Sequence, residues 1–227
     1  MPSPPLTERA RLVAAHLRWP GDPVAIPGLE GPVAAVVDID ENEHEARRGA
    51  GLSALLDLRS LAALWELPHR IPIADQVLSS TLTTRLGGVP PWAAVVRDHT
   101  IERLVRPPVR ISGVVANAAT WRRSATALGA FVTVAPRVAL VAECDPVTVD
   151  VHAEALVWEV GLFREGLGPE LLVEPGPPQV EHGPFQWWLA ERAYAAWLGT
   201  ATGQPRPPVA ASPGTAASLG PRSSPRS

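Results

Sequence analysis

Apolar residues along the chain gather in short runs bounded by Pro, Gly and charged residues, a pattern typical of buried β-strands. The clearest runs are Val33 to Ile39 (VAAVVDI) and Val109 to Val115 (VRISGVV). Shorter or bent runs predict four further strands, at Trp92 to Val96, Phe131 to Ala142, Gly161 to Arg164 and Leu171 to Glu174. The chain is therefore expected to contain a β-sheet.

Helices are predicted where apolar residues recur every three or four positions. The segment Phe185 to Leu198 (FQWWLAERAYAAWL) is apolar over most of its surface. Further helices are expected over Thr7 to Leu17, Leu52 to Leu67, Asp75 to Gly87, Trp121 to Leu128 and Glu154 to Glu159. In the last region, alternation over Val149 to Ala155 equally fits a strand. Asp40 to Glu45 is expected to be an acidic loop.

The order of these elements predicts an α/β fold, with a central mixed β-sheet flanked by helices. A segment of helix and strand (residues 1–72) would precede the main α/β domain (73–198), which the C-terminal amphipathic helix closes. From Gly199 on, Pro, Ala, Ser, Gly and Arg dominate and no acidic residue occurs. Because this composition buries too little apolar surface to offset the entropy of ordering, residues 199–227 are predicted to be a disordered tail.

The composition excludes several reaction classes, because all 20 basic residues are Arg and the chain is lysine-free. A P-loop needs a Lys that reaches the nucleotide phosphates, and Schiff-base chemistry needs a titratable amine. The net charge of −3 provides no global field that attracts nucleic acid. Cys144 is the single cysteine, so neither an internal disulfide nor a thiolate zinc site is expected.

The hydropathy pattern also bears on location. The longest apolar run, Ala130 to Ala142, is interrupted by Pro136 and Arg137 and is too short to span a bilayer. The first residues contain polar side chains where a signal peptide needs a continuous apolar stretch. We therefore expect a cytoplasmic protein without membrane contact and without a cofactor.

The run VRISGVVANAATWRRSATALGAFVTVAPRVALVAE, Val109 to Glu143, resembles part of the restriction-endonuclease-like (PD-(D/E)XK) superfamily. In that pattern a strand precedes a helix that begins near a DWRR element, and a strand of the type RVALVA follows. The continuation AEALVWEVGLFREG…ELLVEP agrees with helix, strand, turn and strand. The resemblance covers about residues 73–175 and implies a restriction-endonuclease-like fold.

Active members of that superfamily hold a metal ion with an Asp on one strand and a Glu-x-Lys on the next. The resemblance places the Asp position at Trp92 and the Glu and Lys positions at Val115 and Asn117. All three catalytic groups are therefore absent. Because losing one acid–base group alone costs about 10²–10⁴ in rate, the resemblance implies a catalytically degenerate relative, a pseudoenzyme that acts by binding.

An aspartate cluster suggests a different chemistry. Asp38 and Asp40 end an apolar strand on one face, and Asp145 and Asp150 follow another. Carboxylates in this position hold Mg²⁺, and the two pairs resemble the aspartate motifs of haloacid-dehalogenase-type phosphatases. That resemblance implies that Asp38 is the nucleophile and Asp40 the acid of an Mg-dependent phosphohydrolase. The alternative is a solvated acidic loop.

Leu82 to Leu104 also fits a helix-turn-helix, with a recognition helix over residues 91–104. Arg97 and Arg103 would then contact DNA, as a transcription regulator requires. The acidic side chains of Asp98 and Glu102 oppose this, and the strand at Trp92 to Val96 competes for the same residues.

Two further groups of residues are candidates for binding. Arg122 and Arg123 form a possible phosphate or acidic-partner contact, although adjacent arginines are often a solvated helix face. In the helix over 185–198, Trp187, Trp188 and Trp197 point in several directions. They predict either docking onto the same domain or self-association and protein partner binding. The sequence thus favours a non-catalytic binding protein that contacts nucleic acid or a protein partner.

Overall fold

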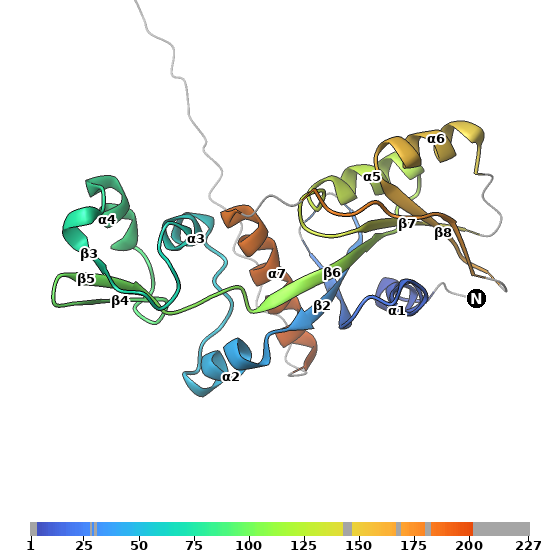
Figure 1. Ribbon diagram of the computed structural model, residues 1–227. Helices are drawn as coiled ribbons and strands as arrows, with labels where there is room; N and C mark the ends of the chain where they lie inside the picture. Colours follow the sequence, from blue (N-terminus) through green and yellow to red (C-terminus); the bar gives the residue numbers. More distant parts are fainter. Residues whose placement is uncertain are drawn as a thin grey trace, which may run out of the picture.

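The structure is a computed structural model that describes residues 4–27, 29, 31–142, 147–166, 169–179 and 183–201. Its described part is α/β, with a mixed six-stranded sheet, a small antiparallel sheet and flanking helices (Figure 1). The predicted class, a mixed sheet flanked by helices, is confirmed. No helix in these residues has the length and apolar content that a membrane crossing requires.

The main sheet has the strand order β1-β2-β6-β7-β8-β9. Its strands are β1 (Asp22–Ile26), β2 (Val33–Ile39), β6 (Val109–Ala116), β7 (Arg137–Val141), β8 (Val160–Arg164) and β9 (Glu170–Val173). Pairing is parallel between β6 and β7 and between β7 and β8, and antiparallel elsewhere. The parallel connections are made by α5 (Trp121–Gly129) and α6 (Val149–Val157), as parallel pairs require a crossover.

Helices cover both faces of this sheet (Figure 1). One face packs against α1 (Leu6–Leu17) through a small apolar cluster that includes Val13, Val115 and Phe163. The other face packs against α5, α6 and α7 (Pro184–Ala201) around buried Leu128, Phe131 and the apolar side of α7. Because both faces are buried, β2 and β6 read as nearly continuous apolar runs.

Residues 40–108 form a lobe between β2 and β6 (Figure 1). It contains α2 (Glu41–Gly49), α3 (Leu58–Trp65), α4 (Ser80–Leu86) and a sheet of β3 (Ile73–Ala74), β5 (Thr100–Arg103) and β4 (Ala94–Arg97). A short 3₁₀ turn spans Asp75–Val77. The lobe packs on α7 through a cluster with Leu61, Leu64 and Trp187. The boundary expected between residues 72 and 73 lies inside this lobe and stays a prediction.

The prediction of an acidic loop at Asp40 to Glu45 is wrong, because α2 begins in this segment. Asp40 is the N-cap residue, and its carboxylate accepts the backbone N–H of Glu43 at 3.1 Å. Acidic residues in the first turn and Arg47 and Arg48 in the last turn match the helix dipole. The acidity of the segment therefore marks a helix start.

Other elements are shorter than expected. The helix predicted over 52–67 begins only at Leu58, because Asp57 caps it and accepts the backbone N–H of Ser60 at 2.9 Å. The helix predicted from Asp75 is a 3₁₀ turn followed by α4, which Ser79 caps. In the segment 131–142 only Arg137–Val141 is a strand. Val149 to Ala155 is helical, and the strand alternative there is wrong.

The alternative prediction of a recognition helix over residues 91–104 is also wrong, because these residues contain the hairpin β4–β5. Asp98 and His99 both have positive φ, 46° and 59°, at the two positions between the paired residues Arg97 and Thr100. Consecutive left-handed residues build the tight turn of a two-residue hairpin and cannot continue a helix. The helix-turn-helix that would read DNA is therefore not formed.

Burial lowers the pKa of His69. The hydrogen bond to the Leu104 carbonyl opposes this shift, and the positive charges of Arg103 and Arg70 add to it. As the pH falls, His69 of the unfolded chain is protonated near pH 6.5, whereas His69 of the folded protein is protonated only at a lower pH. We expect stability to fall as the pH drops below about 6.5, toward the lower folded pKa. His69→Gln should weaken this loss in denaturant titrations between neutral and mildly acidic pH. His152→Gln, at an exposed position on α6, should leave it in place.

Candidate functional site

The pairing of β6 with β2 contains one irregular position. Val36 lies opposite Gly113 and Val37 opposite Ile111, so Ser112 is an extra residue without a partner on β2. Such a β-bulge bends a strand and redirects its side chains, and bulges are over-represented beside functional sites. The bulge lies in the half of β6 that is close to the lobe.

The same half of β6 has an open edge. The pairing between β6 and β7 covers only Val114, Val115 and Ala116. The N–H of Val114 donates to the carbonyl of Pro136 at 2.9 Å, at the point where β7 begins. Over Val109 to Gly113, β2 occupies one edge, and no strand of the described ranges pairs with the other.

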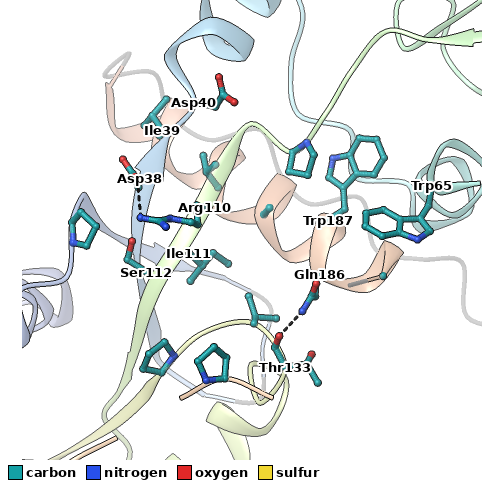
Figure 2. A pocket seen from close by; sticks show the side chains of 18 residues that line it. Asp38, Ile39, Asp40, Trp65, Arg110, Ile111, Ser112, Thr133, Gln186 and Trp187 are labelled. Carbon is teal, nitrogen blue, oxygen red and sulfur yellow. Dashed lines mark hydrogen bonds and ion pairs between the residues drawn. The ribbon is translucent and has the colours of Figure 1, made fainter. Parts of the chain in front are cut away.

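A cleft of about 760 Å³ lies along this edge (Figure 2). Its floor is the bulged half of β6, from Val109 to Ser112. Thr133 and Gln186 lie across from β6. The side-chain amide of Gln186 donates to the backbone carbonyl of Thr133. Figure 2 shows Trp65 and Trp187 at one side of the cleft and Asp38 on the far side of β6. Its size is that of a pocket for a ligand or a short peptide.

Ser112, a lining residue at the bulge, lies on the same side of β6 as Arg110 and Asp38 (Figure 2). Its hydroxyl oxygen is buried, yet it has no hydrogen-bond partner among the described residues. Buried polar groups in folded proteins are nearly always hydrogen-bonded, and each exception calls for an explanation. The Ser112 hydroxyl is such an exception, at the irregular position of the β2–β6 pairing.

The charges around the cleft are balanced in pairs. Asp38 lies 3.4 Å from Arg110, its cross-strand neighbour, and Asp40 lies 2.7 Å from Arg106. Asp40 is further used as the cap of α2. The cleft therefore offers an apolar surface whose nearby carboxylates already have arginine partners.

The aromatic side of the cleft is fixed by contacts within the protein. The rings of Trp65 and Trp187 meet edge to face, with centroids 6.3 Å apart. The Trp187 Nε1–H donates to Glu191 at 3.0 Å, and the Arg103 guanidinium lies over the Trp187 ring at 5.2 Å. Trp187 is 1% exposed. It is a rigid wall of the cleft.

A buried charge network lies directly behind this wall. Glu191 is fully buried, and both of its oxygens accept 2.8 Å hydrogen bonds from the guanidinium of Arg47, which is 1% exposed. Arg47 also donates to Glu43 at 2.8 Å and to the Arg106 carbonyl at 3.0 Å. The Leu55 N–H donates to Glu191 at 2.8 Å. The network thus ties three parts of the lobe, namely α2, Leu55 and the Arg106 carbonyl, to α7.

Burial opposes the charge of Arg47, but the hydrogen bonds and negative charges of Glu191 and Glu43 exceed this effect and raise its pKa. Arg47 therefore stays charged inside the protein. Its guanidinium also lies over the rings of Trp92 and Tyr194, at 5.8 and 5.5 Å. These contacts hold Arg47 in one position, where it fixes the α7 residues that line the cleft.

The positions assigned from the nuclease resemblance do not form one site. Val115 is fully buried in the cluster under α1, whereas Trp92 packs in the lobe. Asn117 follows β6 and lines a separate hollow with Arg123 and Pro32. β6 lies between β2 and β7, and β2 carries Asp38 opposite Arg110. Trp92 therefore does not lie on a strand next to β6, and the assignment of the nuclease positions stays a prediction.

The four aspartates are also not brought together among the described residues. Asp38 and Asp40 lie at the end of β2, whereas Asp150 lies in α6, which packs on β8. Two strands separate β2 from β8, a distance of about 14 Å across the sheet. Asp145 lies outside the described residues. No group of three or more potential metal ligands occurs in the described ranges.

The arginines singled out in the sequence are scattered. Arg97 is exposed beside the hairpin turn, and Arg103 donates to the Leu64 carbonyl at 3.2 Å. Arg122 pairs with Glu154 at 3.1 Å, and Arg123 lies on the exposed side of α5. They do not form one basic surface.

The tryptophans of α7 pack on their own protein. Trp187 is buried, and the Trp188 Nε1–H donates to the Leu56 carbonyl at 3.0 Å. Trp197 contacts His44 edge to face at 5.0 Å. These contacts agree with the alternative in which the helix docks onto its own domain.

Sequence reasoning missed Ser112, Gln186 and the Arg47–Glu191 pair. Two signals were present. Ser112 and Gly113 interrupt an apolar strand, and a Gly inside a strand indicates a bulge or a close approach. Glu191 is the only acid in a helix that is apolar nearly all round, and a buried acid needs a buried partner.

No known family model, curated protein or solved structure matches this chain.

Proposed function

We propose that this chain is a non-catalytic binding protein that holds a segment of a protein partner in the cleft between β6 and α7. The observation that carries the proposal is the open edge of β6 at Val109 to Gly113, which faces an apolar cleft of about 760 Å³. An unpaired strand edge is a template for another chain, and proteins commonly cover or blunt such edges.

A protein partner is favoured over a nucleic acid by the charges. Nucleic-acid binding depends on arginine or lysine side chains that are available for phosphates. At the cleft, Arg106 and Arg110 are already paired with Asp40 and Asp38, and the whole chain carries a net charge of −3. An apolar, neutral cleft suits an uncharged protein segment.

We also propose that the main sheet descends from a restriction-endonuclease-like fold that has lost its catalytic groups. The proposal rests on the sequence pattern of residues 109–175 and on the position of Asp38. Asp38 lies on β2, next to β6, and its cross-strand neighbour is Arg110. In an active nuclease, the neighbouring strand would instead carry the Glu and Lys of the catalytic group. Trp92, Val115 and Asn117 do not line the cleft, so the proposed binding role rests on the open edge of β6 and not on this ancestry.

The proposed function predicts that selection from a displayed library of random linear peptides against the full chain gives cleft-directed binders. Ser112→Trp places an indole beside the open edge of β6, at the bulge, and should lower the affinity of a selected peptide at least about tenfold, as loss of a central contact does. Ser80→Trp, at an exposed position on α4, is the matched control and should bind normally.

Two results would refute the proposed function. One is a set of selected peptides that bind Ser112→Trp as tightly as the unmodified protein. The other is tight, salt-dependent binding of duplex DNA in a fluorescence titration that Ser112→Trp weakens, because this would assign the cleft to nucleic acid.

A further inference from the structure

We infer that the partner segment binds as an added β-strand along the open edge of β6, an inference that rests on the proposed function and specifies its mode. Residues of a strand direct their backbone N–H and C=O groups alternately to its two edges. Over Val109 to Gly113, β2 pairs with one edge only. The groups on the other edge therefore face the cleft without a ladder partner among the described strands.

The position of the added strand is set by β7. The Val114 N–H donates to the Pro136 carbonyl. From there on, β7 pairs with the last three residues of β6. An added strand would lie beside the first five residues of β6, in line with β7. Five residues span about 17 Å, which is an ordinary strand length. The sheet would then be continuous along the whole of β6.

The side chains of the cleft define the sequence that fits. Val109 and Ile111 are buried on the face that packs on α7, where Ala190 and Trp187 also line the cleft. Arg110 points to the other face, where it pairs with Asp38. Successive residues of the added strand would therefore alternate between an apolar surface and a surface of paired charges.

The charge balance excludes a charged segment on the α7 side. A charge buried against Trp187 and Ile111 would lose its hydration, and the nearby Asp40 and Asp38 already have arginine partners. The complementary occupant is an extended, uncharged segment with apolar residues at every second position.

The mode is tested by backbone N-methylation of the tightest selected peptide. Each methyl group removes one N–H donor. Strand addition predicts that N-methylation at every second residue lowers the affinity for the full chain about tenfold or more, whereas the residues between tolerate it. The selected peptides should also show apolar residues at alternate positions.

Three results would overturn the strand-addition mode. The first is tolerance of N-methylation at every position, or a three- to four-residue period typical of a helix in a groove. If Ser112→Trp still abolishes binding in that case, the proposed function stands and only the mode falls. The second is selection of peptides that match residues 202–227, which would assign the edge to the chain's own C-terminal segment. The third is a dimer that Ser112→Trp dissociates in sedimentation experiments, which would assign it to a second copy. A failure to obtain any cleft-directed peptide would refute the proposed function together with its mode.

Discussion

Glu191→Ala is expected to lower the free energy of unfolding by about 3–5 kcal/mol, the usual result of removing one partner from a buried ion pair. Glu191 is fully buried and accepts hydrogen bonds from Arg47, Leu55 and Trp187. Without it, Glu43 is the one buried carboxylate of the described residues that still pairs with the Arg47 charge. Because most domains have a total stability of about 5–15 kcal/mol, this loss would be a large fraction of the whole.

Urea unfolding at neutral pH, followed by far-ultraviolet circular dichroism, measures this loss. Glu191→Gln should lose less than Glu191→Ala, because its amide oxygen still accepts one of these hydrogen bonds. Glu170→Ala is the matched surface control. Glu170 pairs with Arg164 at 3.1 Å but is largely exposed, so its removal should cost less than about 1 kcal/mol. Equal losses at Glu191 and Glu170 would contradict the role assigned to the buried network.

Gly21→Ala is expected to destabilise the protein by about 2–6 kcal/mol, from backbone strain and steric overlap together. Gly21 has φ +104°, and a Cβ atom there would lie 2.0 Å from the carbonyl oxygen of Val37. That oxygen belongs to β2, so the strand itself would have to move. Since Asp38 and Pro20 both line the cleft, peptide binding should weaken as well.

Two other glycines separate the causes. Gly51 has φ +67°, and a Cβ atom there would meet no atom of the described residues within 4 Å. Gly51→Ala should therefore cost only about 1–2 kcal/mol, for its left-handed backbone. Gly49 ends α2 with the same clearance, and Gly49→Ala should be neutral or slightly stabilising. A Gly21→Ala protein as stable as Gly51→Ala would show that the close approach to β2 is unimportant.

Five strands of the main sheet could be predicted, most clearly β2 and β6, which are buried on both faces, whereas β1 was not among the expected strands. Val33–Ile39 and Val109–Ala116 are long apolar runs, and no other environment suits them as well. The small sheet could not be placed in the same way. Its strands have two to four residues, and their assignment depends on the left-handed turn at Asp98 and His99, which sequence pattern alone does not indicate.

The candidate site was beyond the sequence for a different reason. Its parts come from β6, from the segment before β7 and from the start of α7, which lie far apart along the chain. The open edge of the site arises because β2 pairs along the whole of β6, whereas β7 pairs only with the last three residues of β6. Register of this kind depends on the packing of the complete sheet.

The acidic residues show how a motif is misread when its local role is unknown. Asp38 and Asp40 were candidates for a metal site because they end an apolar strand. In the structure Asp40 caps α2 and Asp38 pairs with the neighbouring strand. Capping carboxylates and metal ligands share the same sequence pattern, and only the elements that follow distinguish them.

Amide hydrogen exchange of the full chain, with and without the selected peptide, shows whether the open edge of β6 holds a partner strand. We expect exchange over residues 109–113 to become markedly slower when the peptide is bound, because edge amides acquire hydrogen bonds. Unchanged exchange over residues 109–113, with protection confined to the lobe or to α6, would contradict it.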